Sequence, residues 1–342
     1  MLKPVTIIGG GLSGLCLGIA LRQRGVPARI IEAGHYPRHK VCGEFLSGKG
    51  RAVLASLGIA ARLHGAREAT DVTFSLGAAT TAVRALPSPA LCFSRWKMDA
   101  TLAAMFRELG GDIITSQRAS AETDEGIIRA TGRRPHAVNG GWRLFGLKAH
   151  AHGVTLRAGL EMHFTPRGYV GLCTVEDGRV NACGLFRTRE PVPALSRNWR
   201  SWLGGEPGSA LHTRLAGARW DDASFSSIAA LDLAPRRALP EEGMSIGDAV
   251  TMIPPVTGNG MSMACESAAA AIEPLAAWSA GAVAWEEARR TLASRLQSQF
   301  AGRLRTAAIL QRLLVYSSAR AALFQSVKLV SALQSLLFRM TR

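Results

Sequence analysis

Near its start the chain reads Val5-Thr6-Ile7-Ile8-Gly9-Gly10-Gly11-Leu12-Ser13-Gly14, four apolar residues followed by a glycine-rich turn. The apolar run predicts a short buried strand, and residues 15–24 have helical spacing. Gly25 ends that helix, and residues 28–31 predict a second strand that finishes on Glu32. Strand, glycine turn, helix, strand and terminal acid, in this order, are typical of a dinucleotide-binding βαβ unit.

Each part of this unit has a physical role in holding a pyrophosphate. We expect Gly9 to permit the tight turn, Gly11 to let the pyrophosphate approach the backbone, and Gly14 to let the helix pack against the sheet. The helix N-terminus offers unpaired N–H groups and a positive dipole end to the phosphates, and Leu12 and Ser13, within the glycine turn, are candidate cofactor residues.

The acid that ends the second strand faces the other part of the predicted ligand. Glu32 can accept hydrogen bonds from both ribose hydroxyls, and we place the next residue, Ala33, in the same site. A carboxylate there disfavours a 2′-phosphate on that ribose. The motif by itself does not separate NAD from FAD.

Composition places the chain among globular proteins with a strong positive charge. Its 342 residues are 47% hydrophobic and 19% charged, and the net charge is +16. Residues 288–342 contain no acid at all. Such a charge suits nucleic acid, an anionic membrane surface or an acidic ligand. We disfavour nucleic acid, because no reader motif is present and the basic residues lack interleaved aromatics.

The cysteines and the start of the chain indicate a reducing, cytoplasmic compartment. None of the six cysteines forms a C-x-x-C pair, which argues against a disulfide framework and against a metal site. The chain enters a strand almost at once, unlike a signal peptide, and no stretch has the apolar length of a membrane span.

A second informative stretch runs over residues 246–261, where a strand ends in Gly-Asp, a proline-stiffened loop follows, and Gly-Asn-Gly opens an apolar helix. The aspartate can bind a polyol chain. The helix start can place N–H groups beside a ring carbonyl and stabilise negative charge there, which a reduced flavin needs. The candidate cofactor residues of this stretch are Gly247, Asp248, Pro255, Gly258, Asn259, Gly260 and Met261.

Four stretches together resemble the flavoprotein superfamily that includes para-hydroxybenzoate hydroxylase and the geranylgeranyl reductases. They follow the family's order and are Gly9–Gly14 with Glu32, Lys40-Val41-Cys42-Gly43-Glu44, Ser94-Arg95 with Asp99, and Gly247–Gly260. The resemblance implies FAD, with its adenosine at the first motif and its ribityl chain at Asp248. It also implies that Arg95 lies near the pyrophosphate or ribityl chain, and that Cys42 and Gly43 lie beside the flavin on the substrate side.

Two departures from the family pattern bear on specificity. Ala130-Thr131-Gly132 stands where an Asp-Gly pair is expected. The reductases' aromatic stretch is only partly echoed by residues 168–172, which argues against a geranylgeranyl substrate.

The implied fold class is α/β, with a Rossmann-like FAD-binding domain of the GR2 type, an inserted, mostly antiparallel β-sheet substrate domain and C-terminal helices. We assign residues 1–68, 95–135 and 237–284 to the FAD-binding domain. Residues 69–94 and 136–236 are assigned to the substrate domain, and 285–342 to a basic helical segment.

We therefore expect an FAD-dependent oxidoreductase that acts on a lipophilic or polyketide/isoprenoid-like small molecule. A reductase or dehydrogenase is slightly favoured, with Cys42 as candidate proton donor and Glu44 as candidate base, although either side chain could have only a packing role. The alternative is a monooxygenase that uses NAD(P)H and O2. No second dinucleotide unit is visible, so NAD(P)H would be a transient reductant. Lys148 and His150 face either the substrate cavity or, as we favour, solvent.

The C-terminal segment predicts a basic amphipathic helix. Apolar residues recur at helical spacing, with Lys328, Arg339 and Arg342 between or after them, and they are Leu323, Val327, Val330, Leu333, Leu337 and Met340. Such a helix can contact an anionic membrane, cover the core or form a dimer, and the oligomeric state stays open. A flavin electron-relay protein docked on a membrane is a further alternative.

Overall fold

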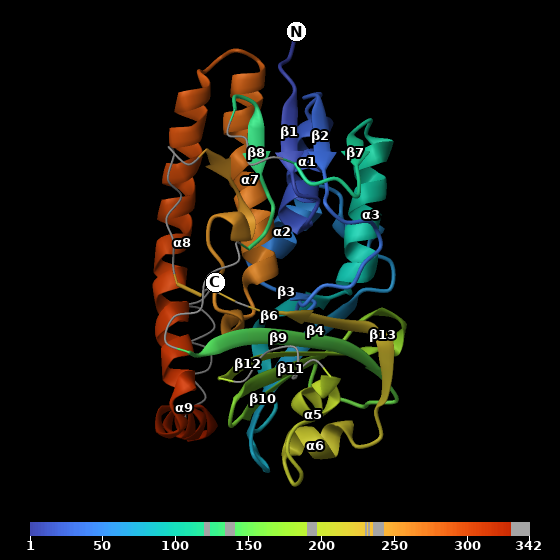
Figure 1. Ribbon diagram of the computed structural model, residues 1–342, viewed down its shortest axis with the longest axis vertical. Helices are drawn as coiled ribbons and strands as arrows, with labels where there is room; N and C mark the ends of the chain where they lie inside the picture. The colour runs from blue at the N-terminus through green and yellow to red at the C-terminus, as the bar shows by residue number, and fades with distance from the viewer. Residues whose placement is uncertain are drawn as a thin grey trace.

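The computed structural model describes residues 1–119, 124–133, 141–189, 197–229, 231, 233–234 and 243–329. Two sheets lie end to end along the long axis of the molecule, and one long helix runs beside both of them (Figure 1). The predicted domain boundaries at 135/136 and 236/237, and the tail from Val330 onward, lie outside the described residues.

The first sheet is parallel and contains the strands that the opening motif predicts. Its order is β14-β8-β1-β2-β7, and every neighbouring pair is parallel. The strands are β1 (Val5–Ile8), β2 (Ala28–Ile31), β7 (Asp112–Ile114), β8 (Ile127–Arg129) and β14 (Met244–Ser245). They are short and apolar because both faces are covered: α1 (Leu12–Gln23), α3 (Arg95–Glu108) and α7 (Gly260–Ser279) pack around them.

Two glycines are required where β1 turns into α1. Gly9 has a φ of +109°, and a Cβ there would lie 2.4 Å from the carbonyl oxygen of Ala130, which directly follows the neighbouring strand β8. A Cβ at Gly14 would lie 2.0 Å from the carbonyl oxygen of Gly9. Any side chain at either position would push the helix away from the sheet, as the motif predicts.

The second sheet is mostly antiparallel, in the order β13-β9-β12-β11-β10-β4-β6-β3, with β5 paired to β4. Its strands are β3 (Phe45–Leu46), β4 (Arg67–Leu76), β5 (Ala79–Thr80), β6 (Arg84–Cys92), β9 (Arg143–His152), β10 (Leu160–Thr165), β11 (Gly168–Thr174), β12 (Val180–Thr188) and β13 (Arg219–Ile228). One pair, β10 with β4, is parallel, so this sheet is completed by strands from distant parts of the chain.

Helices cover the second sheet and join it to the first. The remaining helical elements are α2 (Lys49–Ser56), α5 (Trp199–Gly204), α6 (Ala210–Leu215), α8 (Trp285–Val315) and α9 (Ser317–Leu329), with short 3-10 turns η1 (Ala60–Arg62), η2 (Glu176–Gly178), η4 (Gly247–Ala249) and η5 (Pro255–Thr257). The α8 helix has 31 residues and is therefore roughly 46 Å long, which lets it pass along both sheets (Figure 1).

The predicted α/β fold class is confirmed, whereas the proposed domain boundaries stay a prediction. The two sheets divide the chain close to the predicted ranges. One strand departs from them: β3 pairs with β6 in the second sheet, although its residues were assigned to the FAD-binding domain. Within the described residues, no helix combines the length and apolar character that a membrane span needs.

A buried ion pair holds α8 on α7. The carboxylate of Glu266 accepts two hydrogen bonds from the guanidinium of Arg303, at 2.8 and 2.5 Å, and a third from Gln299 at 3.0 Å. Both members of the pair are buried. Glu273, also on α7, forms an exposed ion pair with Arg24 at the end of α1, and this pair serves as the comparison for the buried one.

We expect Glu266→Ala to lower the free energy of unfolding by about 3–5 kcal/mol, because it leaves the buried Arg303 charge without a partner. Glu273→Ala is the control and should cost at most about 1 kcal/mol, since its ion pair is exposed. Urea unfolding of the two variants measures the difference. Equal losses would show that the buried pair does not hold α8.

Candidate functional site

A cavity of about 870 Å³ lies where the first sheet meets the second. It starts at the carboxyl ends of β1 and β2, the edge at which doubly wound sheets bind their ligands, and reaches the loop before α7. Its far wall comes from the second sheet, with Tyr169 and Gly171 of β11.

Most of the residues predicted to bind the cofactor line this one cavity. They are Gly9, Gly11, Leu12, Ser13, Glu32, Ala33, Cys42, Gly43, Arg95, Asp248, Pro255, Gly258, Gly260 and Met261. Residues more than two hundred positions apart in the chain thus line one cavity whose volume is large enough for a cofactor. Their binding roles remain predictions.

Three predicted cofactor residues lie behind the cavity wall. Gly14 packs against the turn at Gly9. Gly247 has a φ of +61°, and its N–H donates to the Ser267 hydroxyl at 2.9 Å. Asn259 is fully buried, and its side-chain amide has no hydrogen-bond partner within the described part of the chain. Each of these residues shapes the backbone that faces the cavity.

Glu32 is fixed at the end of β2 by the backbone of the glycine turn. One carboxylate oxygen accepts from the N–H of Gly10 at 2.7 Å, and the other accepts from the N–H of Gly34 and from Arg38, both at 2.8 Å. A carboxylate offers about four acceptor positions, so a ribose hydroxyl can still donate to it.

Two cations share one acid on the cavity wall. Arg95 donates two hydrogen bonds to Asp99 at 2.8 Å, and Lys40 Nζ lies 2.8 Å from the same carboxylate. Burial by itself would raise the pKa of Asp99, but the two cations outweigh it and lower that pKa to about 2. The cluster therefore keeps a net positive charge, which suits a pyrophosphate. No sequence signal assigned Lys40 to the site, although it opens the second of the four stretches that resemble the family.

Asp248 is a predicted ribityl-binding residue whose carboxylate faces the cavity. Burial raises its pKa to about 6, against the opposing charges of Arg95 and Arg133. No side chain of the described residues hydrogen-bonds to its carboxylate. A polyol hydroxyl in the cavity would supply that bond. Arg133 also lines the cavity, and only its basic character could have indicated it from the sequence.

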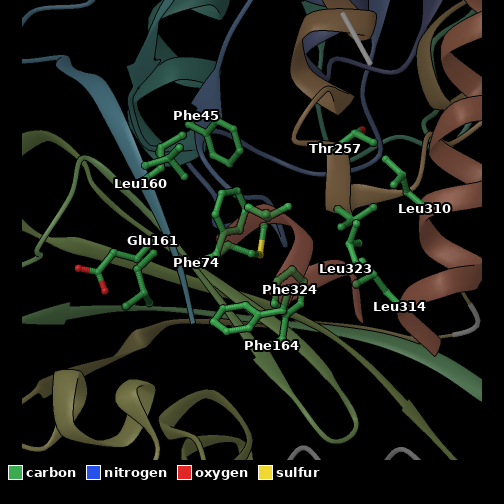
Figure 2. A pocket seen from close by; sticks show the side chains of 17 residues that line it. Phe45, Phe74, Leu160, Glu161, Phe164, Thr257, Leu310, Leu314, Leu323 and Phe324 are labelled. Atoms are coloured by element: carbon green, nitrogen blue, oxygen red, sulfur yellow. The ribbon is translucent and has the colours of Figure 1, made fainter. Parts of the chain in front are cut away.

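A second, smaller pocket of about 130 Å³ adjoins the cavity. The two share Gly43, Phe45, Met162 and Gly171 in their walls. Aromatic and aliphatic side chains converge on the pocket from β3, β4 and β10 on one side and from α8 and α9 on the other (Figure 2). The labelled apolar residues are Phe45, Phe74, Leu160, Phe164, Leu310, Leu314, Leu323 and Phe324.

The pocket offers almost no polar group to a ligand. Of its described lining residues, Thr257 and Glu161 alone have polar side chains. The Glu161 carboxylate points away from the pocket (Figure 2), where it meets His163 at 2.9 Å and Arg214 at 3.1 Å. A ligand here would be held by apolar contact.

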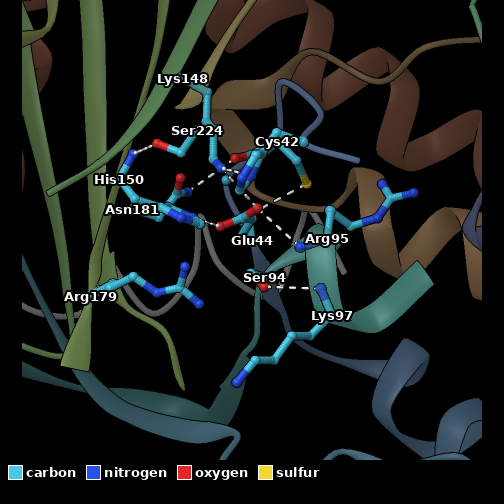
Figure 3. Close-up of polar contacts among 12 residues, drawn as sticks. Cys42, Glu44, Ser94, Arg95, Lys97, Lys148, His150, Arg179, Asn181 and Ser224 are labelled. Carbon is cyan, nitrogen blue, oxygen red and sulfur yellow. Dashed lines mark hydrogen bonds and ion pairs between the residues drawn. The ribbon is translucent and has the colours of Figure 1, made fainter. Parts of the chain in front are cut away.

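The loop that separates cavity and pocket is anchored by Glu44. Its buried carboxylate accepts from the backbone N–H of Arg95 at 3.0 Å and lies 2.6 Å from His150 Nε2 and 3.4 Å from Lys148 Nζ (Figure 3). Burial by itself would raise the pKa of Glu44, but the hydrogen bond from His150 and the charge of Lys148 outweigh it and hold the pKa below its usual value.

This geometry favours a positioning role for Glu44, because its side chain does not line the cavity. Its catalytic role remains only a prediction. The solvent-facing placement that we favoured for Lys148 and His150 is wrong: both are fully buried, since the β9 face that carries them packs on the Glu44 loop.

Cys42 faces the cavity beside Gly43. Burial raises the pKa of its thiol, and the charge of Arg95 only partly offsets this, so the sulfur stays protonated near neutral pH. Its Sγ accepts from the N–H of Glu44 at 3.4 Å, and its carbonyl accepts from Asn181 at 3.0 Å. The thiol can donate a proton but is a poor nucleophile.

His39 also lines the cavity, and no sequence signal pointed to it. Its ring stacks on Trp96 with centroids 4.4 Å apart, and its Nδ1 lies 3.1 Å from Lys148 Nζ. Burial, followed by the charges of Lys148 and His150, lowers its pKa to about 4, so it is neutral at physiological pH.

Comparisons with known proteins agree with this geometry. Residues 3–137 match the FAD binding domain family. No curated protein matches the chain by sequence. Among solved structures, the flavin-dependent brominase Bmp2 has a TM-score of 0.75 at 16% identity and covers 99% of this chain and 93% of its own.

Two other solved structures have the same fold. PqsL, a probable FAD-dependent monooxygenase from Pseudomonas aeruginosa, has a TM-score of 0.69 at 17% identity over 95% of this chain and 99% of its own. A flavoprotein/dehydrogenase from Cytophaga hutchinsonii has a TM-score of 0.74 at 16% identity over 94% and 88%. At these identities the likeness establishes the fold.

The fold, the cavity and the family match define an FAD-binding flavoenzyme. The chain is an FAD-dependent oxidoreductase: residues 3–137 match the FAD binding domain family, and the fold is that of flavin-dependent enzymes, in agreement with the four sequence stretches. Its residues fit FAD: the glycine turn, Arg95 with Lys40, and Asp248, which has no hydrogen-bonded side chain among the described residues, all line the same cavity.

We expect Gly11→Asp and Asp248→Ala to yield protein with little bound FAD. A Cβ at Gly11 meets nothing closer than Lys40 Nζ at 3.8 Å, so the aspartate fits the fold but places negative charge where the pyrophosphate would bind. Asp248→Ala removes the predicted ribityl acceptor. Flavin absorbance per protein, with the mass of the released cofactor, measures the loss.

Two substitutions serve as controls for these variants. Gly217→Asp adds the same side chain at an exposed glycine with open space around it, and Asp222→Ala removes an exposed carboxylate. Both should retain FAD. Stoichiometric FAD in Gly11→Asp and Asp248→Ala would contradict the assigned site.

Proposed function

We propose that this protein is an FAD-dependent monooxygenase that oxidises a lipophilic small molecule, with NAD(P)H as a transient reductant. The observation that carries the proposal is the apolar pocket, which adjoins the cavity and shares Gly43 and Phe45 with its wall. Since the pocket offers apolar side chains from every direction, it fits an alkyl or aryl group and no charged one.

The chain's own residues would position this substrate and exclude water. Phe45 and Met162 lie in the walls of both spaces, so they border any group that passes between them. The N-terminus of α7 lies at the same cavity, and its dipole would stabilise negative charge there. Bound FAD would supply the redox chemistry, which includes reaction of the reduced ring with O2.

The structural comparisons support oxygen chemistry over simple reduction. A brominase and a probable monooxygenase, each flavin-dependent, have this fold over nearly the whole chain. The apolar lining of the pocket also suits a reaction whose oxidising species has to be kept away from water.

A reductase or dehydrogenase is the second candidate, and Cys42 favours it. Its protonated thiol lines the cavity beside Gly43, where it could deliver a proton to a carbon–carbon double bond that receives hydride. The fold of a flavoprotein/dehydrogenase is equally similar.

Oxygen uptake separates the two candidates. With holoprotein, NAD(P)H and 4-alkylphenols of increasing chain length as probes, we expect substrate-stimulated O2 consumption and products that carry one atom from labelled O2. Cys42→Ser should retain most of this activity. A product of unchanged oxygen content, formed without air and lost in Cys42→Ser, would establish the reductase instead.

Gly171→Leu should block the passage between cavity and pocket. A Cβ at Gly171 meets only the carbonyl oxygen of Cys183 at 3.8 Å, so the larger side chain projects into the shared space without disturbing β11. We expect alkylphenol binding to weaken by roughly tenfold or more, equivalent to about 1.4 kcal/mol, with FAD retained. Gly302→Leu, at an open position on α8, is the control. Unchanged binding would place the substrate elsewhere.

A further inference from the structure

Exposed apolar side chains gather at the C-terminal end of α8. Ile309 is 58% exposed, Leu313 40% and Tyr316 66%. Large apolar residues with this much exposure are uncommon in the rest of the described chain. Leu329, at the end of α9, is exposed as well. Exposed apolar side chains that cluster in this way usually mark a surface that binds a partner or a membrane.

Ile309 and Leu313 share one face of α8 with two arginines, and Tyr316 follows as the C-cap residue, whose backbone is extended. Ile309 and Leu313 are four positions apart, and Arg305 and Arg312 flank them at helical spacing, all exposed. The opposite face of the same turns is buried and comprises Leu304, Ala307 and Leu314. We call the exposed set, Arg305, Ile309, Arg312, Leu313 and Tyr316, the α8 outer face.

The described part of the predicted tail helix, up to Leu329, packs elsewhere. In α9, Leu323 and Val327 line the apolar pocket, so the described part of the predicted amphipathic stripe packs inward, one of the alternatives that the sequence left open. Arg84 donates to the carbonyl oxygens of Val327 and Lys328, at 2.9 and 3.1 Å, and holds the end of α9 against the second sheet.

We propose that the α8 outer face docks the protein on the surface of an anionic lipid bilayer. An apolar patch between arginines matches the interfacial zone of a membrane, where apolar side chains enter the acyl boundary and cations meet the headgroups. Residues 288–342 add positive charge and no acid. Since no described helix can span a bilayer, the contact is peripheral.

The charge pattern argues against a second copy of this chain as the occupant. A two-fold contact would place the same surface on both sides, so a patch that contains Arg305 and Arg312 would face a second patch with the same two cations. No acid of residues 288–342 could pair with them, because that segment has none. Like charges at short range oppose such an interface.

The location links docking to the apolar pocket. Leu310 and Leu314 line the pocket, and Ile309 and Leu313 precede them on the same turns of α8 and face outward. One helix thickness therefore separates the proposed membrane surface from the pocket. Docking does not depend on the proposed monooxygenase activity, but it would bring the pocket beside a source of lipophilic molecules.

Vesicle sedimentation of the full-length holoprotein tests the proposal. We expect binding to mixed phosphatidylcholine–phosphatidylglycerol vesicles, little binding to pure phosphatidylcholine, and release as salt is raised. Ile309→Ser with Leu313→Ser, and separately Arg305→Gln with Arg312→Gln, should each weaken binding by roughly tenfold or more. Because no substrate is present, the result is independent of the enzymatic proposal.

Matched controls are available on the same chain. Leu2→Ser removes a residue as exposed as Leu313, and Arg290→Gln removes an exposed charge at the other end of α8. Both should bind vesicles like the unaltered protein. Thermal unfolding and FAD content should also be unchanged in the Ile309/Leu313 variant, whereas destabilisation would show that the chain itself covers this face and would overturn the proposal.

Three further outcomes would also overturn it. The first is equal binding to neutral and anionic vesicles. The second is vesicle binding that the α8 substitutions leave unchanged. The third is a dimer in sedimentation velocity that Leu313→Ser dissociates, since a second copy would then occupy the face.

Discussion

The buried carboxylate of Glu44 joins the two halves of this enzyme. Its three partners come from the start of α3, which packs on the first sheet, and from β9 in the second. A buried charge is stable only when it is paired and hydrogen-bonded. Removing any one of the three partners would therefore leave the Glu44 carboxylate with too few contacts to offset the cost of its burial. Glu44 also has a φ of +57°, which a non-glycine residue adopts only when its surroundings hold it there. The loop at Cys42 and Gly43 is thereby fixed between cavity and pocket.

Charged side chains of both signs line the cavity, as binding of a dinucleotide would require. They include the carboxylate of Glu32 at the end of β2, the cations Arg95 and Lys40 beside Asp99, and Asp248, whose pKa is raised. The last group costs free energy as long as no ligand donates to it, so the cofactor should contribute to the stability of the fold as well as to catalysis. The adjoining pocket is lined almost entirely by apolar side chains, so it would select a ligand by shape rather than by hydrogen bonds.

Sequence patterns predicted the features that depend on near neighbours. The turn from Gly9 to Gly14 and the loop before α7 are local motifs, and the structure places most of their predicted residues around one cavity, whereas their cofactor-binding roles stay a prediction. Contacts between distant parts of the chain could not be predicted from these patterns. Lys148 and His150 have the sequence pattern of a solvated strand, and only the structure shows that both pair with Glu44, about a hundred residues earlier. For the same reason, helical spacing alone could not show that Leu323 and Val327 face a pocket. Periodicity reveals an apolar face but not what that face contacts.

The parallel pairing of β4 with β10 has a consequence for how the chain folds. Phe74 pairs in register with Met162, and between these strands the chain builds α3, β7 and β8 of the first sheet. The second sheet therefore cannot be completed until a long intervening segment has found its own place, which is a slow, non-local closure. Neither half is a contiguous piece of chain that could be exchanged or inherited as a block. Any ancestral recombination that replaced the substrate-facing sheet would have had to exchange three separate segments at once, namely β3, β4 to β6, and β9 to β13.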